Sequence, residues 1–162
     1  MTAHANITPY SPTIRSIGII DVEFGKDVTI VNPVNLYGCK ISDGCFIGPF
    51  VEIQKDVTIG NRTRIQSHSF ICELTTIGED CFIGHGTMFI NDTFETGAPA
   101  RFQRDLWKPT YVGNRVTIGT NVTILPVTIC DGAVIGAGSV VTRAIEVAGI
   151  YTGSPARMVR PL

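Results

Sequence analysis

Two pairs of side chains that could do acid–base chemistry stand eighteen residues apart in this 162-residue chain. Glu73 precedes Asn91 by eighteen positions, and Ser67 precedes His85 by the same interval. A carboxylate or an amide oxygen can orient an amine, whereas a histidine, whose ordinary pKa is about 6.5, can accept a proton near neutral pH. If eighteen residues bring the chain back to the same place, each pair forms a small polar site.

A six-residue period explains why eighteen is the relevant spacing. An aliphatic or aromatic residue occupies every sixth position from Ile41 to Phe89, and the fourth residue after each is small or β-branched. Six helical steps of about 100° end on a different face, so the pattern excludes an amphipathic helix. It is typical of a parallel β-helix, in which three hexads form one three-sided coil. Residues eighteen apart should then stack about 4.8 Å from each other.

The repeat divides a single domain, residues 1–162, into an ordered series of parts. In chain order we expect an irregular N-terminal cap over 1–20, repeats over 24–90, an inserted loop over 91–111, repeats over 112–142 and a C-terminal tail over 143–162. The expected fold is therefore all-β, with about six coils. Ser154 followed by Pro155 is typical of a helix start, which predicts one short helical turn over 155–160.

Composition excludes several classes of function. The net charge of −1 argues against binding nucleic acid or an anionic membrane through bulk electrostatics. No apolar run approaches the roughly 20 residues that span a bilayer, and residues 1–12 lack a signal-peptide pattern. The five cysteines form no CxxC pair, which favours buried, reduced thiols in a cytoplasmic protein without a metal.

The repeat and three longer stretches resemble a known family. The pattern aliphatic-Gly-x-x-small-x resembles the signature of left-handed β-helix, or hexapeptide-repeat, acyltransferases, and the left hand follows from this resemblance alone. The stretches are QSHSFICELTTIG at 66–78, CFIGHGTMFIND at 81–92 and GAGSVVTRAIEVAGIYTGSPARMVR at 136–160. With the loop, they resemble bacterial nucleotide-sugar N-acetyltransferases, except that Ser154 replaces the asparagine common in the family's closing motif.

This resemblance implies a reaction, a co-substrate and an assembly. The family transfers acetyl from acetyl-CoA to an amine, here expected at C3, of a UDP- or dTDP-linked amino sugar used for O-antigen or other surface polysaccharides. It forms homotrimers in which acetyl-CoA and the sugar bind between neighbouring β-helices.

Site residues follow from the resemblance together with the stacking rule. For catalysis we expect Asn91, Asp92, His85 and Glu73. For substrate binding we expect His68, Gln66, Arg101 and Trp107. For the cofactor we expect Gly119, Thr120, Gly136, Ala137, Arg143 and Arg157, in which small residues let pantetheine approach the backbone and arginines meet phosphates.

Other readings of the same residues stay open. Polar residues at solenoid corners are commonly solvated and have no chemical role. An O-acetyltransferase of this fold would need His85 as a base for a sugar or serine hydroxyl. A zinc carbonic anhydrase of this fold would need three histidines, and only His68 and His85 lie within the repeats. A scaffold subunit without CoA binding is a fourth reading, against which the tail and loop argue.

Overall fold

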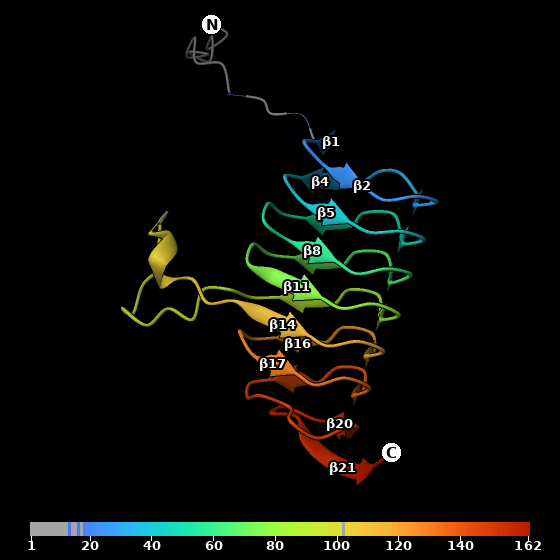
Figure 1. Cartoon of the computed structure of the whole chain (residues 1–162). Helices are drawn as coiled ribbons and strands as arrows, with labels where there is room; N and C mark the ends of the chain where they lie inside the picture. The colour runs from blue at the N-terminus through green and yellow to red at the C-terminus, as the bar shows by residue number, and fades with distance from the viewer. Residues whose placement is uncertain (1–12, 14–15, 17, 102) are drawn as a thin grey trace, which may run out of the picture.

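The chain winds into a three-sided prism with one long loop projecting from it (Figure 1). The computed structural model describes residues 13, 16, 18–101 and 103–162. Each side of the prism is one sheet, called here A, B and C, and strands within a sheet are parallel except for the last pair of sheet C. The fold is the expected left-handed parallel β-helix.

The strands follow one another around the prism in a fixed order. Sheet A holds β1 (Ile19–Ile20), β4 (Asn35–Tyr37), β7 (Glu52–Ile53), β10 (Phe70–Ile71), β13 (Met88–Phe89), β16 (Thr123–Ile124) and β19 (Val140–Val141). Sheet B holds β2 (Glu23–Phe24), β5 (Lys40–Ile41), β8 (Thr58–Ile59), β11 (Thr75–Ile77), β14 (Thr110–Val112) and β17 (Thr128–Ile129). Sheet C holds β3 (Thr29–Ile30), β6 (Phe46–Ile47), β9 (Arg64–Ile65), β12 (Phe82–Ile83), β15 (Thr117–Ile118), β18 (Val134–Ile135), β20 (Gly149–Thr152) and β21 (Arg157–Pro161).

The register of neighbouring strands confirms the stacking rule. Ile41 pairs with Ile59, and Ile59 pairs with Ile77, in each case eighteen residues on. The step shortens to seventeen where one residue is missing, as between Asn35 and Glu52. It shortens again after Pro126, so that Tyr111 pairs with Thr128. Corner residues at equivalent positions therefore stack from coil to coil.

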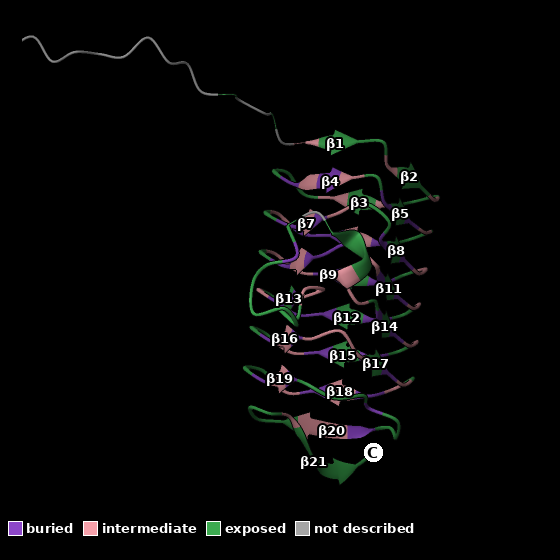
Figure 2. Cartoon of the chain, turned by 90° about the vertical axis from the view of Figure 1, so that its left-hand side faces the viewer, coloured by how far each residue is buried: buried purple, intermediate pink, exposed green. Residues whose placement is uncertain are grey.

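The core is the aliphatic ladder that the six-residue period predicts. Every marker residue from Ile41 to Phe89 is at most 1 % exposed. Figure 2 shows buried segments on one coil after another along the prism. Burial of each of these side chains contributes about 1.5–3 kcal/mol. The small inward position also takes hydroxyls, because each can bond to a nearby carbonyl: Thr63 Oγ1 donates to Gly78 O at 2.8 Å, and Ser69 Oγ donates to Gly84 O at 3.0 Å.

Tight corners join the three sheets. Non-glycine residues adopt positive φ at six-residue intervals, from Phe50 (60°) through Asp56 (58°) and Arg62 (58°) to His68 (62°). A residue that turns the chain in this way costs free energy, which the ordered coils on either side must offset. We name the corners by their contents: the loop corner between sheets A and B, the ladder corner between B and C, and the histidine corner between C and A.

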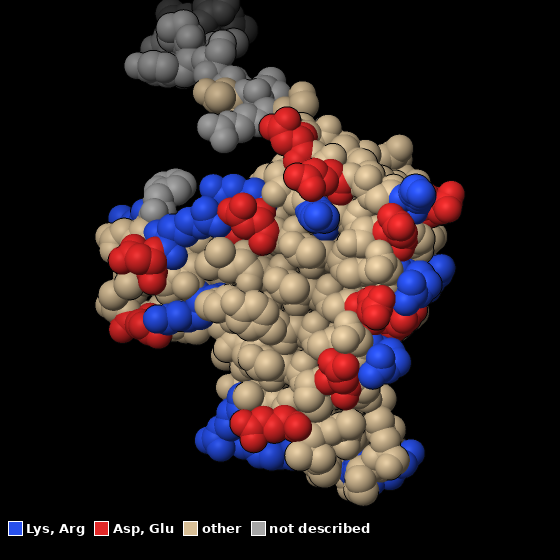
Figure 3. Space-filling view, viewed as in Figure 1, with Lys and Arg blue, Asp and Glu red and all other residues tan. Residues whose placement is uncertain are grey.

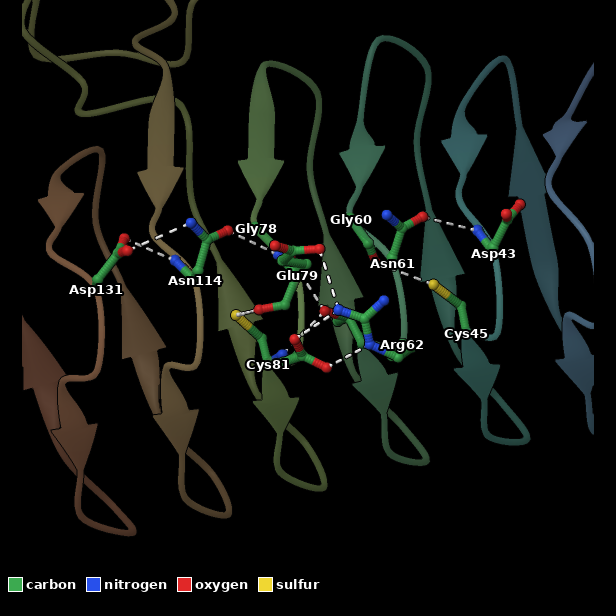
Figure 4. A network of polar contacts seen from close by, with 12 residues as sticks. Asp43, Cys45, Gly60, Asn61, Arg62, Gly78, Glu79, Cys81, Asn114 and Asp131 are labelled. Atoms are coloured by element: carbon green, nitrogen blue, oxygen red, sulfur yellow. Dashed lines mark hydrogen bonds and ion pairs between the residues drawn. The ribbon is translucent and has the colours of Figure 1, made fainter.

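The ladder corner shows how side chains tie one coil to the next (Figure 4). Asp43 Oδ1 accepts from the backbone N–H of Lys26 at 2.8 Å, and Asn61 Oδ1 accepts from the backbone N–H of Asp43 at 3.2 Å. Further along, Asn114 Oδ1 accepts from the backbone N–H of Glu79 at 3.0 Å. These bonds occupy corner donors that have no strand partner.

Two expectations about the ends of the prism need correction. The fold has about seven coils rather than about six, because β1 pairs in register with β4 although its sequence does not show the repeat. The short helical turn expected over 155–160 is wrong: β21 pairs antiparallel with β20. A helix this short is marginal alone, whereas pairing with β20 satisfies backbone groups at the end of sheet C. Ile14 and Ile17, expected in the cap, lie outside the described residues.

Within the described part of the chain, no helix is long and apolar enough to cross a membrane. The one helix there is η1 (Arg104–Leu106), a 3₁₀ turn in the projecting loop.

Candidate active site on two corners of the prism

The expected site residues separate onto two corners. Glu73, Asn91 and Asp92 lie on the loop corner, which follows the sheet A strands β10 and β13. Gln66, His68 and His85 lie on the histidine corner, after the sheet C strands β9 and β12. The glycine-containing pairs 119–120 and 136–137 lie on the same corner, after β15 and β18. Sheet A separates these corners within one chain.

On the loop corner, the stacking of Glu73 and Asn91 is confirmed. Asn91 Nδ2 donates to the backbone carbonyl of Glu73 at 3.3 Å. Asn91 Oδ1 then remains as the acceptor with which this side chain can meet an amine N–H.

Asp92 determines the conformation at the base of the loop. Its Oδ1 accepts from the backbone N–H of Phe94 at 2.9 Å, and its Oδ2 accepts from that of Ala100 at 2.8 Å. Ala100 is buried, so this carboxylate folds the start of the loop into a compact turn. The observed contacts of Asp92 are therefore structural, because both oxygens already accept from the chain.

The Glu73 carboxylate lies close to two cationic side chains, those of Arg104 and Lys55. Its side chain is 11 % exposed, and Oε2 lies 3.4 Å from Arg104 Nε and 3.9 Å from Lys55 Nζ. Arg104 also forms an ion pair and hydrogen bond with Asp56. Glu73 thus interacts first with its own chain, since a buried carboxylate is stable as an ion only beside opposite charge.

The loop brings further charges to this region. Figure 3 shows Lys and Arg gathered with Asp and Glu where the loop projects from the prism. Lys108 pairs with Glu95 inside the loop at 3.5 Å. Arg101 is exposed, and Trp107 is half-buried next to η1. Along the sequence, Arg101 and Trp107, the two loop residues expected to bind substrate, lie three positions before and three positions after Arg104.

On the histidine corner, two stacked pairs form. Ser67 Oγ lies 2.8 Å from His85 Nδ1, within hydrogen-bond distance. The ring of His68 stacks on that of Phe50, with 4.8 Å between centroids and 27° between planes. Because Nδ1 of His85 is occupied by Ser67, its Nε2 is the nitrogen left for a ligand. Gln66 is half-buried on the same corner.

In the coils that follow His85, the residues stacked on it are small. Ile83 pairs with Ile118, and Ile118 with Ile135, so His85, Thr120 and Ala137 stack in one line. Thr120 and Ala137 are exposed. A Cβ added to Gly119 would lie 2.6 Å from Ala137 N, and one added to Gly136 would lie 2.6 Å from Thr152 Cγ2. Close packing between coils therefore requires glycine at 119, where the added Cβ would meet backbone, whereas at 136 it would meet only a side-chain methyl group.

Arg143 and Arg157 lie elsewhere, at the base of the prism below the loop corner. They line a pocket of about 190 Å³ together with Val141, Tyr151 and Met158. No carboxylate pairs with either arginine among the described residues. The expected cofactor residues thus divide between the histidine corner and this basal pocket.

The thiols and possible metal ligands have ordinary structural surroundings. Burial raises the pKa of Cys39 and of Cys72 to about 11, so these thiols stay protonated and unreactive near neutral pH. Among the residues that the structure describes, no group of three or more His, Cys, Asp or Glu side chains is arranged to hold a metal ion.

Sequence reasoning missed Phe50, Lys55 and Asp56, and it considered Arg104 only as a cation for the substrate rather than as a partner of Asp56 and Glu73. Phe50 stands eighteen residues before His68, and Lys55 stands eighteen before Glu73, so the stacking rule would have placed both. Arg104 was beyond that rule, because the loop that carries it has no period.

Similarity to known proteins agrees with this architecture. The family model described as bacterial transferase hexapeptide (six repeats) matches residues 38–73, and that described as hexapeptide repeat of succinyl-transferase matches 74–88 and 109–143. The two cover more than half of the chain and leave out most of the loop. The bifunctional protein GlmU of Clostridium acetobutylicum is 33 % identical over 139 residues, which are 82 % of this chain and 27 % of that protein. The chain therefore spans about a quarter of this curated relative.

Two solved structures share the fold. A hexapeptide-repeat acetyltransferase of Vibrio cholerae, complexed with acetyl coenzyme A, is 29 % identical, with a TM-score of 0.62 over 77 % of this chain and 71 % of that one. A mutant of the GDP-perosamine N-acetyltransferase of Caulobacter crescentus, in complex with CoA and GDP-perosamine, is 19 % identical, with a TM-score of 0.63 over 85 % of this chain and 56 % of that one. On its repeats and its fold, the chain belongs to the hexapeptide-repeat acyltransferase family.

Proposed function

We propose that the protein is an acetyl-CoA-dependent N-acetyltransferase that acts on a nucleotide-linked amino sugar, with the amine at C3. The observation that carries the proposal is the line formed by His85, Thr120 and Ala137 on the histidine corner. An acyl carrier lying along the small, exposed part of this line would bring its thioester to a histidine. The Vibrio cholerae relative, which was solved with acetyl coenzyme A, supports the choice of carrier.

In this reaction the sugar amine attacks the thioester carbonyl, a tetrahedral intermediate forms, and the C–S bond breaks to release the CoA thiolate. His85 Nε2 accepts the amine proton when Nδ1–H donates to Ser67. Asn91 Oδ1 accepts an N–H of the same amine and orients its lone pair. The departing thiolate receives the proton that His85 took from the amine, so the histidine is regenerated and atoms and charge balance.

His85 and Asn91 lie on different corners, so we propose that each site forms between two copies in a homotrimer. The loop corner of one copy would face the histidine corner of the next. The outward face of sheet A from β10 to β19 supports close contact between copies, because it carries several apolar side chains, whereas Asn35 and Glu52 make the face polar at β4 and β7. The apolar residues are Phe70, Met88, Ile90, Leu125 and Val140.

The proposed class of substrate, a nucleotide-linked sugar, is supported mainly by residues of the loop. Arg101 is exposed beside the loop corner and would meet a diphosphate, while Trp107 and His68 offer ring faces to a base or sugar. The Caulobacter crescentus structure contains a nucleotide-linked amino sugar, which supports this class as a fold-level analogy. A role in O-antigen or other surface polysaccharide synthesis is part of the proposal.

An O-acetyltransferase is the second candidate, and the contact between Ser67 and His85 favours it. A hydroxyl is a weaker nucleophile than a neutral amine, so its transfer depends more strongly on a correctly oriented base.

Release of free CoA thiol from acetyl-CoA tests the two candidates. The acceptor panel should hold UDP-, dTDP- and GDP-linked amino sugars and the matching hydroxy sugars. Turnover confined to amino sugars is expected. Turnover confined to hydroxy sugars would establish the second candidate, and no turnover with any acceptor would reject both.

A further inference from the structure

The inserted loop is fixed firmly at its base. It leaves the loop corner after β13 and returns at β14, and the backbone N–H of Lys108 donates to Asn91 O at 2.8 Å to close it. Asp92 accepts from two loop N–H groups, and Ala100 is buried. These contacts hold the two ends of the loop but do not reach its tip.

The tip, around η1, has a different kind of anchor. None of the three η1 residues is fully buried and only Leu106 is half-buried, so packing holds this turn against the prism weakly. Arg104 extends from it to Asp56, which follows β7, and to Glu73, which follows β10. A single guanidinium thus connects the loop to the two coils that precede its own point of departure.

The carboxylate of Glu73 suits this anchoring role. Its Oε2 is buried and accepts no hydrogen bond from the described residues, so the neighbouring cations are what stabilise it. Lys55 lies 3.9 Å away and Arg104 3.4 Å away. The planar fork of arginine can contact carboxylates on two adjacent coils at once, which a lysine ammonium cannot do with the same geometry.

We propose that Arg104 is a positioning residue that holds the loop tip across the upper loop corner, through Asp56 and Glu73. By fixing η1, it fixes Trp107, which directly follows η1, and Arg101, which precedes it. Arg104 itself contacts no reacting atom. Its consequence for sugar binding rests on the proposed function, whereas its consequence for loop position does not.

Trp107 allows a test without substrate, because it is the only tryptophan of the chain. Acrylamide quenching of its fluorescence reports how closely the loop lies against the prism. We expect Arg104→Ala to raise the quenching constant about twofold, as a locally released segment would, and Arg104→Lys to give an intermediate value. High salt should raise it in the wild type more than in Arg104→Ala, because salt screens the ion pairs.

Two further variants keep the test decisive. Lys108→Ala is the matched control: it removes a loop cation of similar exposure whose partner, Glu95, lies within the loop. It should leave the quenching constant close to that of the wild type. Asp56→Asn removes the partner from the coil side and should reproduce the effect of Arg104→Ala. Equal melting temperatures by circular dichroism will show that the prism remains folded. Wild-type quenching in both Arg104→Ala and Asp56→Asn would overturn the proposal.

Activity separates this inference from the proposed function. If the enzyme turns over an amino sugar, Arg104→Ala should raise the KM for that sugar about tenfold or more and leave the KM for acetyl-CoA near the wild-type value, because the loop carries sugar contacts only. An unchanged sugar KM would reject the positioning role even if quenching changes. If the wild type turns over no acceptor, the proposed function fails, while the quenching result still decides whether Arg104 holds the loop.

Discussion

Ser67 Oγ lies 2.8 Å from His85 Nδ1, on the next coil of the same corner. The serine hydroxyl can accept from Nδ1–H or donate to Nδ1, so the contact orients the histidine ring in either tautomer. The contact gives His85 a defined orientation on a corner where most side chains are exposed. The same geometry suits a base and excludes free rotation of the ring.

His85→Ala is expected to lower kcat about 10²-fold if the acceptor is an amine, which is the low end for loss of a general base. A positioned amine can still react as the thiolate takes its proton, so some activity should remain. Ser67→Ala should lower kcat less than His85→Ala does and leave the KM for acetyl-CoA near the wild-type value, because it removes only the contact that orients the ring. Ser67→Thr keeps the hydroxyl and serves as the control. A wild-type kcat in Ser67→Ala would contradict the positioning of His85.

Asn91→Ala and Asp92→Ala should differ in what they change. Asn91→Ala removes the proposed amine acceptor and should lower kcat with little change in loop structure. Asp92→Ala removes two hydrogen bonds to backbone N–H groups, so it should loosen the loop base and raise the KM for the sugar. Steady-state kinetics with Thr93→Ala as the exposed neighbouring control will separate the two effects. If the double variant retains both constants, neither residue belongs to the site.

Gly119→Ala should act on stability before it acts on cofactor binding. A Cβ at this position would lie 2.6 Å from the backbone nitrogen of Ala137, and backbone on a neighbouring coil can move little. Overpacking of this kind costs about 1–3 kcal/mol in the free energy of unfolding. Thr120→Ala, one residue on and exposed, should leave urea unfolding unchanged and raise the KM for acetyl-CoA. A fully stable Gly119→Ala variant with a raised KM would show instead that the glycine is selected for the cofactor.

The periodic part of the chain was predictable because position along the sequence determines position in space. The marker residues fill the core, and the interval of eighteen correctly joins Glu73 to Asn91 and Ser67 to His85. The prediction fails where the period stops. The partners of Arg104 depend on how the loop folds back, which no spacing encodes.

The C-terminal end illustrates a different limit. Ser154 and Pro155 have the local preferences of a helix start, yet β21 pairs with β20 instead. Local preference is worth less than the backbone hydrogen bonds available at the edge of sheet C. Spacing along the sequence also does not predict which corner residues act together, because sheet A separates the loop corner from the histidine corner within one chain.

Stability should fall in alkaline solution through the buried thiols. Burial raises the pKa of Cys39 and of Cys72 to about 11 in the folded state, above the ordinary value of 9.0. Between these two pKa values the folded state binds more protons than the unfolded state, so the free energy of unfolding decreases as pH rises from about 9 toward 11. Urea unfolding at several pH values measures the slope. The double variant Cys39→Ser, Cys72→Ser should show a shallower slope, and an equal slope would assign the alkaline loss to other groups.

Asn114 and Glu79 occupy equivalent positions on the ladder corner but behave differently. Asn114 Oδ1 accepts from the backbone N–H of Glu79, whereas the longer Glu79 side chain turns away and contacts Arg62 at 3.1 Å (Figure 4). The ladder is therefore interrupted at Glu79. A shorter Asn or Asp there would reach the preceding coil, as Asn61 reaches the backbone N–H of Asp43.

Asn114→Ala should lower the free energy of unfolding by about 1 kcal/mol, and Glu79→Asn should raise it by about 0.5–1 kcal/mol. Arg62 keeps its two contacts with Asp80 in the second variant, at 2.7 Å each, so the loss of its Glu79 contact costs little. Urea unfolding of both variants measures these changes in the free energy of unfolding, which should have opposite signs. Destabilisation by Glu79→Asn would show that side-chain hydrogen bonds at this corner do not add stability.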